Sequence, residues 1–135
     1  MAQVTSWQEK ALVLLPGLRE TIMNAENPMS MWIDLHIELE RAYETTPRDE
    51  HLIENIFRYA HWSEFESGDD DLQTAASVAF YEHLPAHAKV RADLPNWITK
   101  EEFLALKSLF PYFLEPNEYL EFEREFLAAT ERKTN

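Results

Sequence analysis

The chain contains no cysteine and only 2 glycines among its 135 residues. Without cysteine there is no disulfide, no thiol nucleophile and no cysteine-based zinc site. Two glycines cannot build a glycine-rich phosphate cradle, and they argue against a sheet rich in tight hairpins. The longest apolar run near the N-terminus, residues 11–15, is too short for a signal-peptide core or a membrane span. We therefore expect a cytoplasmic protein without a cofactor.

Positive charge is scarce as well. The sequence has 12 lysines and arginines against 25 aspartates and glutamates, which gives a net charge of −13. This balance disfavours nucleic acid as a direct partner, because phosphate binding needs a basic surface. It equally disfavours an anionic membrane surface. Two interpretations remain open, a basic protein partner and simple solubility.

Recognisable catalytic motifs are missing too. The sequence holds no H-E-x-x-H, no E-x-x-H pair, no G-x-S-x-G, no P-loop and no G-x-G-x-x-G. The run Asp69–Asp71 lacks the alternating ligands and the following glycine of a calcium loop, so we interpret it as a helix start. The sequence therefore favours a protein that is not an enzyme.

What the sequence does contain is a regular succession of helical segments separated by seven prolines. Its length suits one domain. We predict a single all-α domain over residues 1–135, a bundle of about six mostly antiparallel helices or a short helical-repeat-like array, with residues 130–135 as a frayed tail. The main helices are expected at residues 5–15, 28–44, 47–65, 70–84, 99–109 and 116–132, with a short turn or helix at 18–25 and a short helix at 86–92.

The segment 70–84 is predicted to be the buried central helix. Its apolar arc is rich in alanine, so a neighbouring helix can approach closely. Negative residues at its start suit a helix N-terminus, and Pro85 is expected to end it. The arc comprises Leu72, Ala75, Ala76, Ala79 and His83.

The segment 28–44 carries a narrow apolar stripe that includes Trp32, Leu35 and Leu39. Ile33 and Ile37 widen this surface, so we expect neighbours to cover the helix on more than one side. A further hypothesis is a structural or regulatory subunit that dimerises through the face of Trp7 or Trp32.

A metal site is the first candidate for chemistry. His36 and Glu40 are neighbours at i,i+4 spacing, and a metal would need at least one more ligand, from His61, Glu64 or His83. The alternatives are a boundary histidine bonded to a neighbour or to water, and a structural His83 that favours the end of its helix. The predicted metal set is His36, Glu40 and His83.

An acidic and aromatic surface near the C-terminus is the second candidate. The aromatic run 110–113 either fills the core or lines a groove, together with Trp97. If it is exposed, aromatic anchors and nearby carboxylates would suit a basic protein partner. Glu121 and Glu125 form a like-charged i,i+4 pair, which is unfavourable in isolation. The predicted partner-binding residues are Glu115, Glu118, Glu121, Glu125, Tyr112 and Tyr119.

Three segments carry a resemblance to a known group of proteins: M-W-I-D-L-H-I-E-L-E-R-A-Y at 31–43, L-I-E-N-I-F-R-Y-A at 52–60 and A-A-S-V-A-F-Y-E-H-L at 75–84. They resemble small acidic all-helical bacterial domains of uncharacterised function, some of which are suspected to be immunity proteins that neutralise a toxin. The resemblance implies a binding role and carries over no catalytic residue. It spans residues 31–84 and leaves out the C-terminal acidic residues.

Two functional hypotheses follow from these observations. The first is an acidic binding module of the immunity or inhibitor type that engages a basic protein. The second is a metal- or small-ligand-binding helical protein with a site of histidine and glutamate between its helices.

Overall fold

The computed structural model describes residues 4–134, without the side chains of 133 and 134, and this part of the chain is helical and contains no strand. The all-α prediction is confirmed. The chain divides into two compact units, Met1–Phe80 and Tyr81–Asn135. The single domain expected from the sequence stays a prediction. None of the helices described has the length and apolar character needed to cross a membrane.

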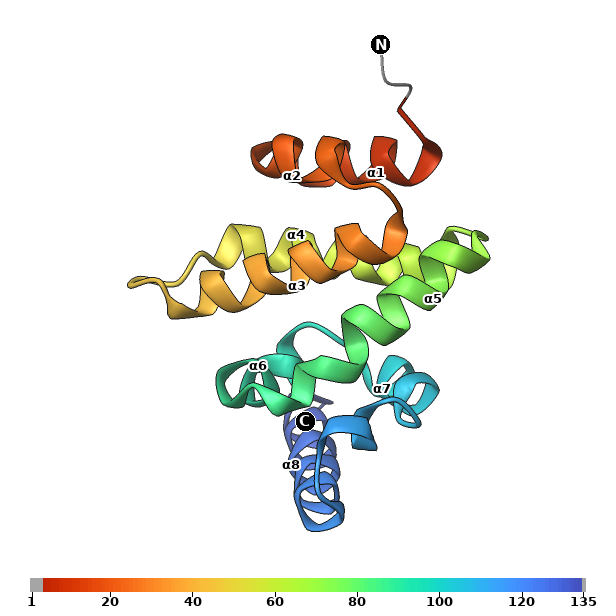
Figure 1. The fold of residues 1–135 in the computed structure, drawn as a ribbon. Helices are drawn as coiled ribbons and strands as arrows, with labels where there is room; N and C mark the ends of the chain where they lie inside the picture. Colours follow the sequence, from red (N-terminus) through yellow and green to blue (C-terminus); the bar gives the residue numbers. More distant parts are fainter. Residues whose placement is uncertain (1–3, 135) are drawn as a thin grey trace. The chain divides into compact units, whose positions relative to one another are not determined.

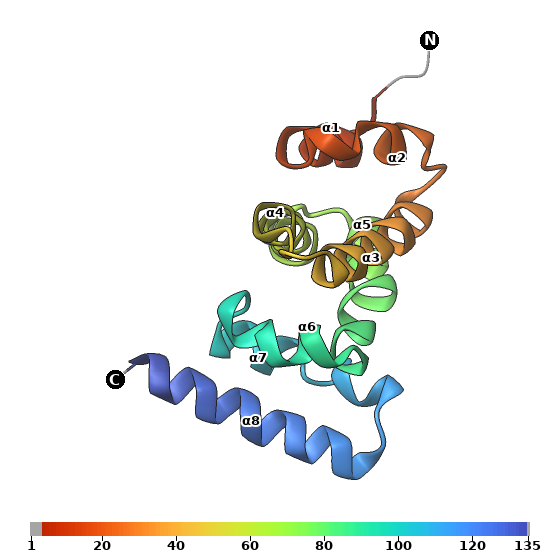
Figure 2. The same cartoon turned by 90° about the vertical axis from the view of Figure 1, so that its left-hand side faces the viewer.

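The first unit contains five α-helices: α1 (Ser6–Leu14), α2 (Arg19–Asn24), α3 (Pro28–Glu44), α4 (Glu50–His61) and α5 (Asp70–Ala79). A 3-10 turn, η1 (Pro16–Leu18), precedes α2, and a π-helical turn, η2 (Trp62–Glu66), extends α4. In both ribbon views α1 and α2 lie on the same side of α3 and α4 (Figure 1, Figure 2). Helix α5 packs against α3 and η2.

Local capping explains where several of these helices begin. Thr5 and Gln8 form a capping box at α1, and Asn27 and Ser30 form the equivalent arrangement at α3, with Pro28 in the first turn. Each cap supplies a side-chain acceptor to a backbone N–H that the helix cannot satisfy. The predicted starts of these two helices are therefore close to the observed ones.

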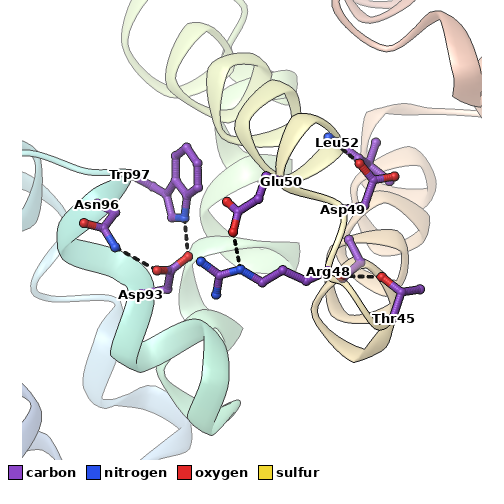
Figure 3. A network of polar contacts seen from close by, with 9 residues as sticks. Thr45, Arg48, Asp49, Glu50, Leu52, Asp93, Asn96 and Trp97 are labelled. Carbon is purple, nitrogen blue, oxygen red and sulfur yellow. Dashed lines mark hydrogen bonds and ion pairs between the residues drawn. The ribbon is translucent and has the colours of Figure 1, made fainter.

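Helix α4 begins later than predicted. The sequence suggested that Thr46-Pro47 opens it, but α4 starts at Glu50, with Asp49 as its N-cap. The Asp49 carboxylate accepts a hydrogen bond from the backbone N–H of Leu52 at 3.1 Å, and Arg48 forms an ion pair with Glu50 (Figure 3). A carboxylate at the N-cap satisfies a free N–H and suits the positive end of the helix, which explains the start at this point.

An aromatic cluster around Trp32 forms the core of the first unit. Trp32 is fully buried, and its ring centroid lies 5.2 Å from that of Tyr59 and 4.8 Å from that of Phe80. Phe57 meets the edge of Phe80 at 5.5 Å. Each such ring pair stabilises the fold by roughly 0.5–1.5 kcal/mol in addition to the contribution from its buried apolar area. Because Trp32 is inside this cluster, a dimer through an exposed Trp32 face, as one hypothesis suggested, is wrong.

Tyr59 also connects α4 to α1. Its hydroxyl donates a hydrogen bond to the backbone carbonyl of Trp7 at 2.7 Å. Burial of the phenol, the largest effect, raises the pKa of Tyr59 well above its usual value, so the group stays protonated and available as a donor. One buried side chain therefore satisfies a carbonyl more than fifty positions earlier.

Helix α5 buries the predicted alanine arc but is shorter than expected. Leu72, Ala75, Ala76 and Ala79 are all buried. The helix ends at Ala79 rather than Leu84, and residues 81–86 form a 3-10 segment, η3 (Tyr81–Ala86). Pro85 has no N–H to donate to the carbonyl of residue 81, and its ring disfavours an α-helical turn there. His83 consequently lies in η3 and not in the last turn of the central helix.

The second unit contains η3 and three α-helices: α6 (Ala88–Asp93), α7 (Lys100–Leu106) and α8 (Pro116–Thr134). Two short 3-10 segments, η4 (Leu94–Asn96) and η5 (Phe110–Phe113), connect them. The predicted capping box of Thr99 and Glu102 opens α7. However, α7 ends before residue 109, and α8 remains helical through 130–134, where a frayed tail was expected. Asn135 lies outside the described residues.

Four phenylalanines form the core of the second unit. The ring of Phe103 on α7 stacks on that of Phe126 on α8, with centroids 4.3 Å apart. Phe110 and Phe122 meet edge to face at 5.5 Å, and each of them also contacts Phe103. All four side chains are buried. This packing decides which side of α8 faces the solvent.

The alanine arc of α5 yields the first testable prediction. Replacing Ala76 by Leu inserts three carbon atoms where the side chain is fully buried, so we expect the free energy of unfolding to fall by about 1–3 kcal/mol. Thr74→Leu on the exposed side of the same helix serves as control and should leave stability within about 0.5 kcal/mol of the original. Urea denaturation measures both. Equal stability of the two variants would contradict a tightly packed arc.

Candidate functional site

The C-terminal acidic surface is defined here as Glu115, Glu118, Glu121, Glu125, Tyr112 and Tyr119. Its four glutamates are exposed. Positions 118, 121 and 125 form an exposed arc of α8 that borders the buried arc of Phe122 and Phe126. The core contacts of Phe122 and Phe126 therefore turn these carboxylates toward the solvent.

None of the four carboxylates forms an ion pair in the part of the chain that the structure describes, although Arg124 stands three positions after Glu121 on α8. No lysine, arginine or histidine nitrogen of that part lies within 4.0 Å of them. Glu118 does have a structural contact, because its Oε1 accepts the backbone N–H of Glu115 at 3.1 Å and caps the start of α8. Glu121 and Glu125 are left as like-charged neighbours at i,i+4 spacing, which is unfavourable for the isolated helix.

The aromatic residues of this surface differ in what they can do. Tyr112 is 73% exposed, and its ring lies 5.1 Å from that of Phe113, which is itself half exposed. Phe113 in turn stacks on His83, with ring centroids 4.3 Å apart. Phe110 belongs to the core, so the aromatic run 110–113 divides between core and surface. Tyr112 is the side chain of this run that is most available to a partner.

Tyr119 is only partly exposed and already has a partner. Its hydroxyl donates to Oε2 of Glu123 at 2.7 Å. Burial, then the hydrogen bond to Glu123 and the charge of that carboxylate, raise the pKa of Tyr119 to about 12. We expect Tyr119 to hold Glu123 in place rather than to act as an anchor.

Trp97 was expected either to fill the core or to line a groove with the aromatic run 110–113. Its indole is held by Asp93, which was not predicted to be a site residue. Asp93 is buried, and its Oδ2 accepts the indole N–H of Trp97 at 2.6 Å, while its Oδ1 accepts the amide of Asn96 at 2.8 Å (Figure 3). Trp97 also lines a hollow of about 480 Å³. The hollow contains no histidine, so it does not correspond to the predicted site of histidine and glutamate. The i, i+3, i+4 spacing of Asp93, Asn96 and Trp97 is the signal that could have revealed this cluster.

The predicted metal ligands come together only in part. His36 Nε2 lies 3.9 Å from Glu40 Oε2, as the i,i+4 spacing suggested. Each of the three proposed third ligands has another neighbour: His61 pairs with Glu66, Glu64 is bound by Ser77, and His83 stacks on Phe113. Among the side chains described, no three metal-ligating groups are placed to hold an ion.

Glu64 is the perturbed carboxylate of the first unit. The Ser77 hydroxyl lies 2.9 Å and 2.8 Å from its two oxygens. Burial, which is the largest effect, raises the pKa of Glu64, although hydrogen bonds from Ser77 and Gln73 oppose the shift. The contact joins η2 to α5, and no sequence spacing could have shown it.

Comparisons with protein-family models, with curated proteins and with solved structures each return no match to this chain. The resemblance of residues 31–84 to acidic immunity-like domains therefore stays a prediction.

The raised pKa of Glu64 predicts how stability depends on pH. Above the ordinary pKa of 4.5, the unfolded chain releases this proton while the folded chain retains it. Unfolding then releases a proton, so a rise in pH favours the unfolded state. We expect the melting temperature of the original protein to fall more steeply from pH 4.5 upward than that of Glu64→Gln, which has no carboxylate to ionise.

Glu20→Gln is the control for this experiment. It removes the same charge at an exposed position, so its pH profile should run parallel to that of the original protein. Thermal melts followed by circular dichroism at a series of pH values measure all three proteins. A Glu64→Gln profile parallel to the original would contradict the raised pKa.

Proposed function

We propose that this chain is a binding module without enzymatic activity, and that it engages a basic protein through the C-terminal acidic surface. The observation that carries the proposal is the set of four exposed carboxylates that form no ion pair in the described part of the chain. Tyr112 adds an exposed ring three residues before the first of them. These are the chemical components of a surface for a cationic partner.

The two kinds of side chain would contribute differently. The carboxylates attract a cationic partner over distance and raise its association rate, and the net charge of −13 strengthens this field. Tyr112 can supply apolar contact area once the partner arrives, since interface anchors are enriched in tyrosine. The specificity of the module would then depend on whether a partner places cationic groups opposite the carboxylates and an apolar group against Tyr112.

The resemblance to immunity-like domains suggests which kind of partner the chain would bind. The partner would be a basic toxin or nuclease, and binding would occlude its active surface. We place the protein in the cytoplasm and expect neither nucleic acid nor an anionic membrane as direct partner, because the carboxylates would repel phosphate groups. The alternative of a metal-binding protein has no third ligand to support it in the described part of the chain.

A charge-reversal experiment tests the proposed surface. The immobilised chain captures a basic protein from a cell lysate at low ionic strength, and the captured protein is then purified. Titration calorimetry compares the original chain with the double variant Glu121→Lys, Glu125→Lys. We expect the dissociation constant to rise at least about tenfold, because two attractive interactions become repulsive.

The control is the double variant Glu9→Lys, Glu20→Lys, which changes the net charge equally at exposed positions of the first unit. It should alter the dissociation constant by no more than about threefold, since neither position belongs to the C-terminal acidic surface and salt screens charges beyond about 8 Å. Equal weakening by both double variants would show a response to net charge alone. No weakening by Glu121→Lys, Glu125→Lys would place the interface elsewhere.

A further inference from the structure

A hollow of about 480 Å³ lies beside the short connection between α6 and α7. Its lining comprises residues 95–101 and two residues of α8, Thr130 and Glu131. All of them belong to the second compact unit, and we call this space the Trp97 hollow. Pockets that hold small molecules measure roughly 300–1,000 Å³. The Trp97 hollow therefore has room for a small ligand.

The indole of Trp97 is held in place before any ligand arrives. The buried side chain of Asp93 accepts the indole N–H at 2.6 Å and the amide of Asn96 at 2.8 Å (Figure 3). A ring that is already ordered lowers the free-energy cost of binding a ligand against it. Because Asp93 takes the single N–H of the indole, Trp97 offers the hollow a ring surface rather than a hydrogen-bond donor.

The uncharged polar side chains of the lining are bonded within the chain. The hydroxyl of Thr99 accepts the backbone N–H of Glu102 at 3.1 Å. The hydroxyl of Thr130 donates to the backbone carbonyl of Leu127 at 2.9 Å, and the amide of Asn96 is the donor described above. The remaining uncharged lining is apolar. A ligand would therefore be held more by apolar contact and ring packing than by hydrogen bonds.

The charged side chains of the lining determine which ligands the hollow accepts. They are the ammonium of Lys100 and the carboxylates of Glu101 and Glu131, and all three residues are exposed. The net charge of −13 surrounds the whole chain with a negative potential. An anionic ligand is therefore disfavoured.

We propose that the Trp97 hollow binds a small molecule through an aromatic ring that carries no negative charge. The ring packs against the indole of Trp97, in the offset-stacked or edge-to-face arrangement that aromatic pairs prefer. The apolar side chains of Pro95 and Ile98 line the same space. An aliphatic group of the same size gains the apolar contact but lacks the interaction between two aromatic rings.

This site is separate from the proposed function. The Trp97 hollow and the C-terminal acidic surface share no residue, so either proposal can be correct without the other. The hollow also differs from the site of histidine and glutamate expected from the sequence, because its lining contains no histidine.

The first test compares ligands that differ in one property at a time. Fluorine NMR on the full chain measures the binding of para-fluorobenzyl alcohol, which is uncharged, and of para-fluorobenzoate, which is an anion. We expect the alcohol to bind at least about fivefold more tightly, because the negative potential of the chain opposes the benzoate. Equal affinity for the two probes would overturn the proposal.

Competition tests the requirement for an aromatic ring. Unlabelled benzyl alcohol should displace para-fluorobenzyl alcohol at a concentration at least about threefold lower than cyclohexylmethanol does, since the contact between two rings adds to the burial of area. Equal displacement by both competitors would contradict a ring-specific site.

Trp97→Leu and Trp97→Phe form a matched pair of variants. Both remove the N–H that Asp93 accepts, so any effect of the lost hydrogen bond is common to the two. Trp97→Phe keeps a ring and should retain the preference for benzyl alcohol over cyclohexylmethanol, whereas Trp97→Leu should lose it. Circular dichroism checks that both variants fold. If Trp97→Leu kept the preference, the ring would bind elsewhere and the proposal would be wrong.

Trp62→Leu is the control in the first unit. Trp62 is also partly exposed, and its ring lies 6.0 Å from that of Tyr59, outside the Trp97 hollow. Its loss should leave the binding of para-fluorobenzyl alcohol unchanged, as should Glu121→Lys, Glu125→Lys on the C-terminal acidic surface. A loss of binding in Trp62→Leu equal to that in Trp97→Leu would contradict the proposal. A loss in the glutamate variant would place the ring on the C-terminal acidic surface instead.

A measurement on the original chain covers the case in which Trp97→Leu does not fold. The chain has four tryptophans, and each indole N–H gives a signal in a proton–nitrogen NMR spectrum. Titration with benzyl alcohol should shift the assigned signal of Trp97 and leave the other three in place. A shift confined to another tryptophan, or no shift at all, would overturn the proposal.

Discussion

The packing of Trp32 between Tyr59 and Phe80 fixes which side of α3 faces the core of the first unit. A helix that packs on one side buries a limited arc, and on α3 this arc belongs to Trp32, Leu35 and Leu39. Rotating the helix to bury Ile33 and Ile37 would expose the largest side chain of the cluster. Full burial of Trp32 stabilises the fold by more than the additional burial that Ile33 and Ile37 would gain, because both isoleucines are already half covered. The exposure of Met29, Ile33 and Ile37 is thus a consequence of the core.

The acidic side chains occupy two kinds of position, helix starts and exposed helix surfaces. Some carboxylates act at helix starts, where they accept free backbone N–H groups: Asp49 at α4, Asp69 at α5, Glu102 at α7 and Glu118 at α8. Other carboxylates lie at exposed positions and add to the surplus of 25 acidic over 12 basic side chains. On α8 Glu118, Glu121 and Glu125 lie along an exposed arc beside the buried arc of Phe122 and Phe126. Folding of the second unit therefore creates the C-terminal acidic surface.

The sequence predicted best what depends on neighbouring residues. Helix starts marked by Thr5, Asn27 and Thr99 could be predicted because a cap and its N–H partners lie within four residues. The ends of α5 and α7 were less predictable, since several turn geometries compete there.

Contacts between distant segments could not be predicted. The bond between Glu64 and Ser77 joins residues thirteen positions apart, and that from Tyr59 to the carbonyl of Trp7 spans fifty-two. No periodicity encodes such pairs. The same limit applies to Ile33 and Ile37: α2, α4 and α5 contact α3, yet these two side chains stay half exposed. Apolar spacing shows which residues share a face but not whether a neighbour covers that face.

Steering of a cationic partner by surface carboxylates is the central claim for the function of this chain. The most direct test is the association rate constant of the captured partner, measured by stopped flow at a series of salt concentrations. Electrostatic steering predicts that this rate falls steeply as ionic strength rises, while the dissociation rate changes little. An association rate that does not respond to salt would contradict the claim, because uncharged docking does not depend on screening.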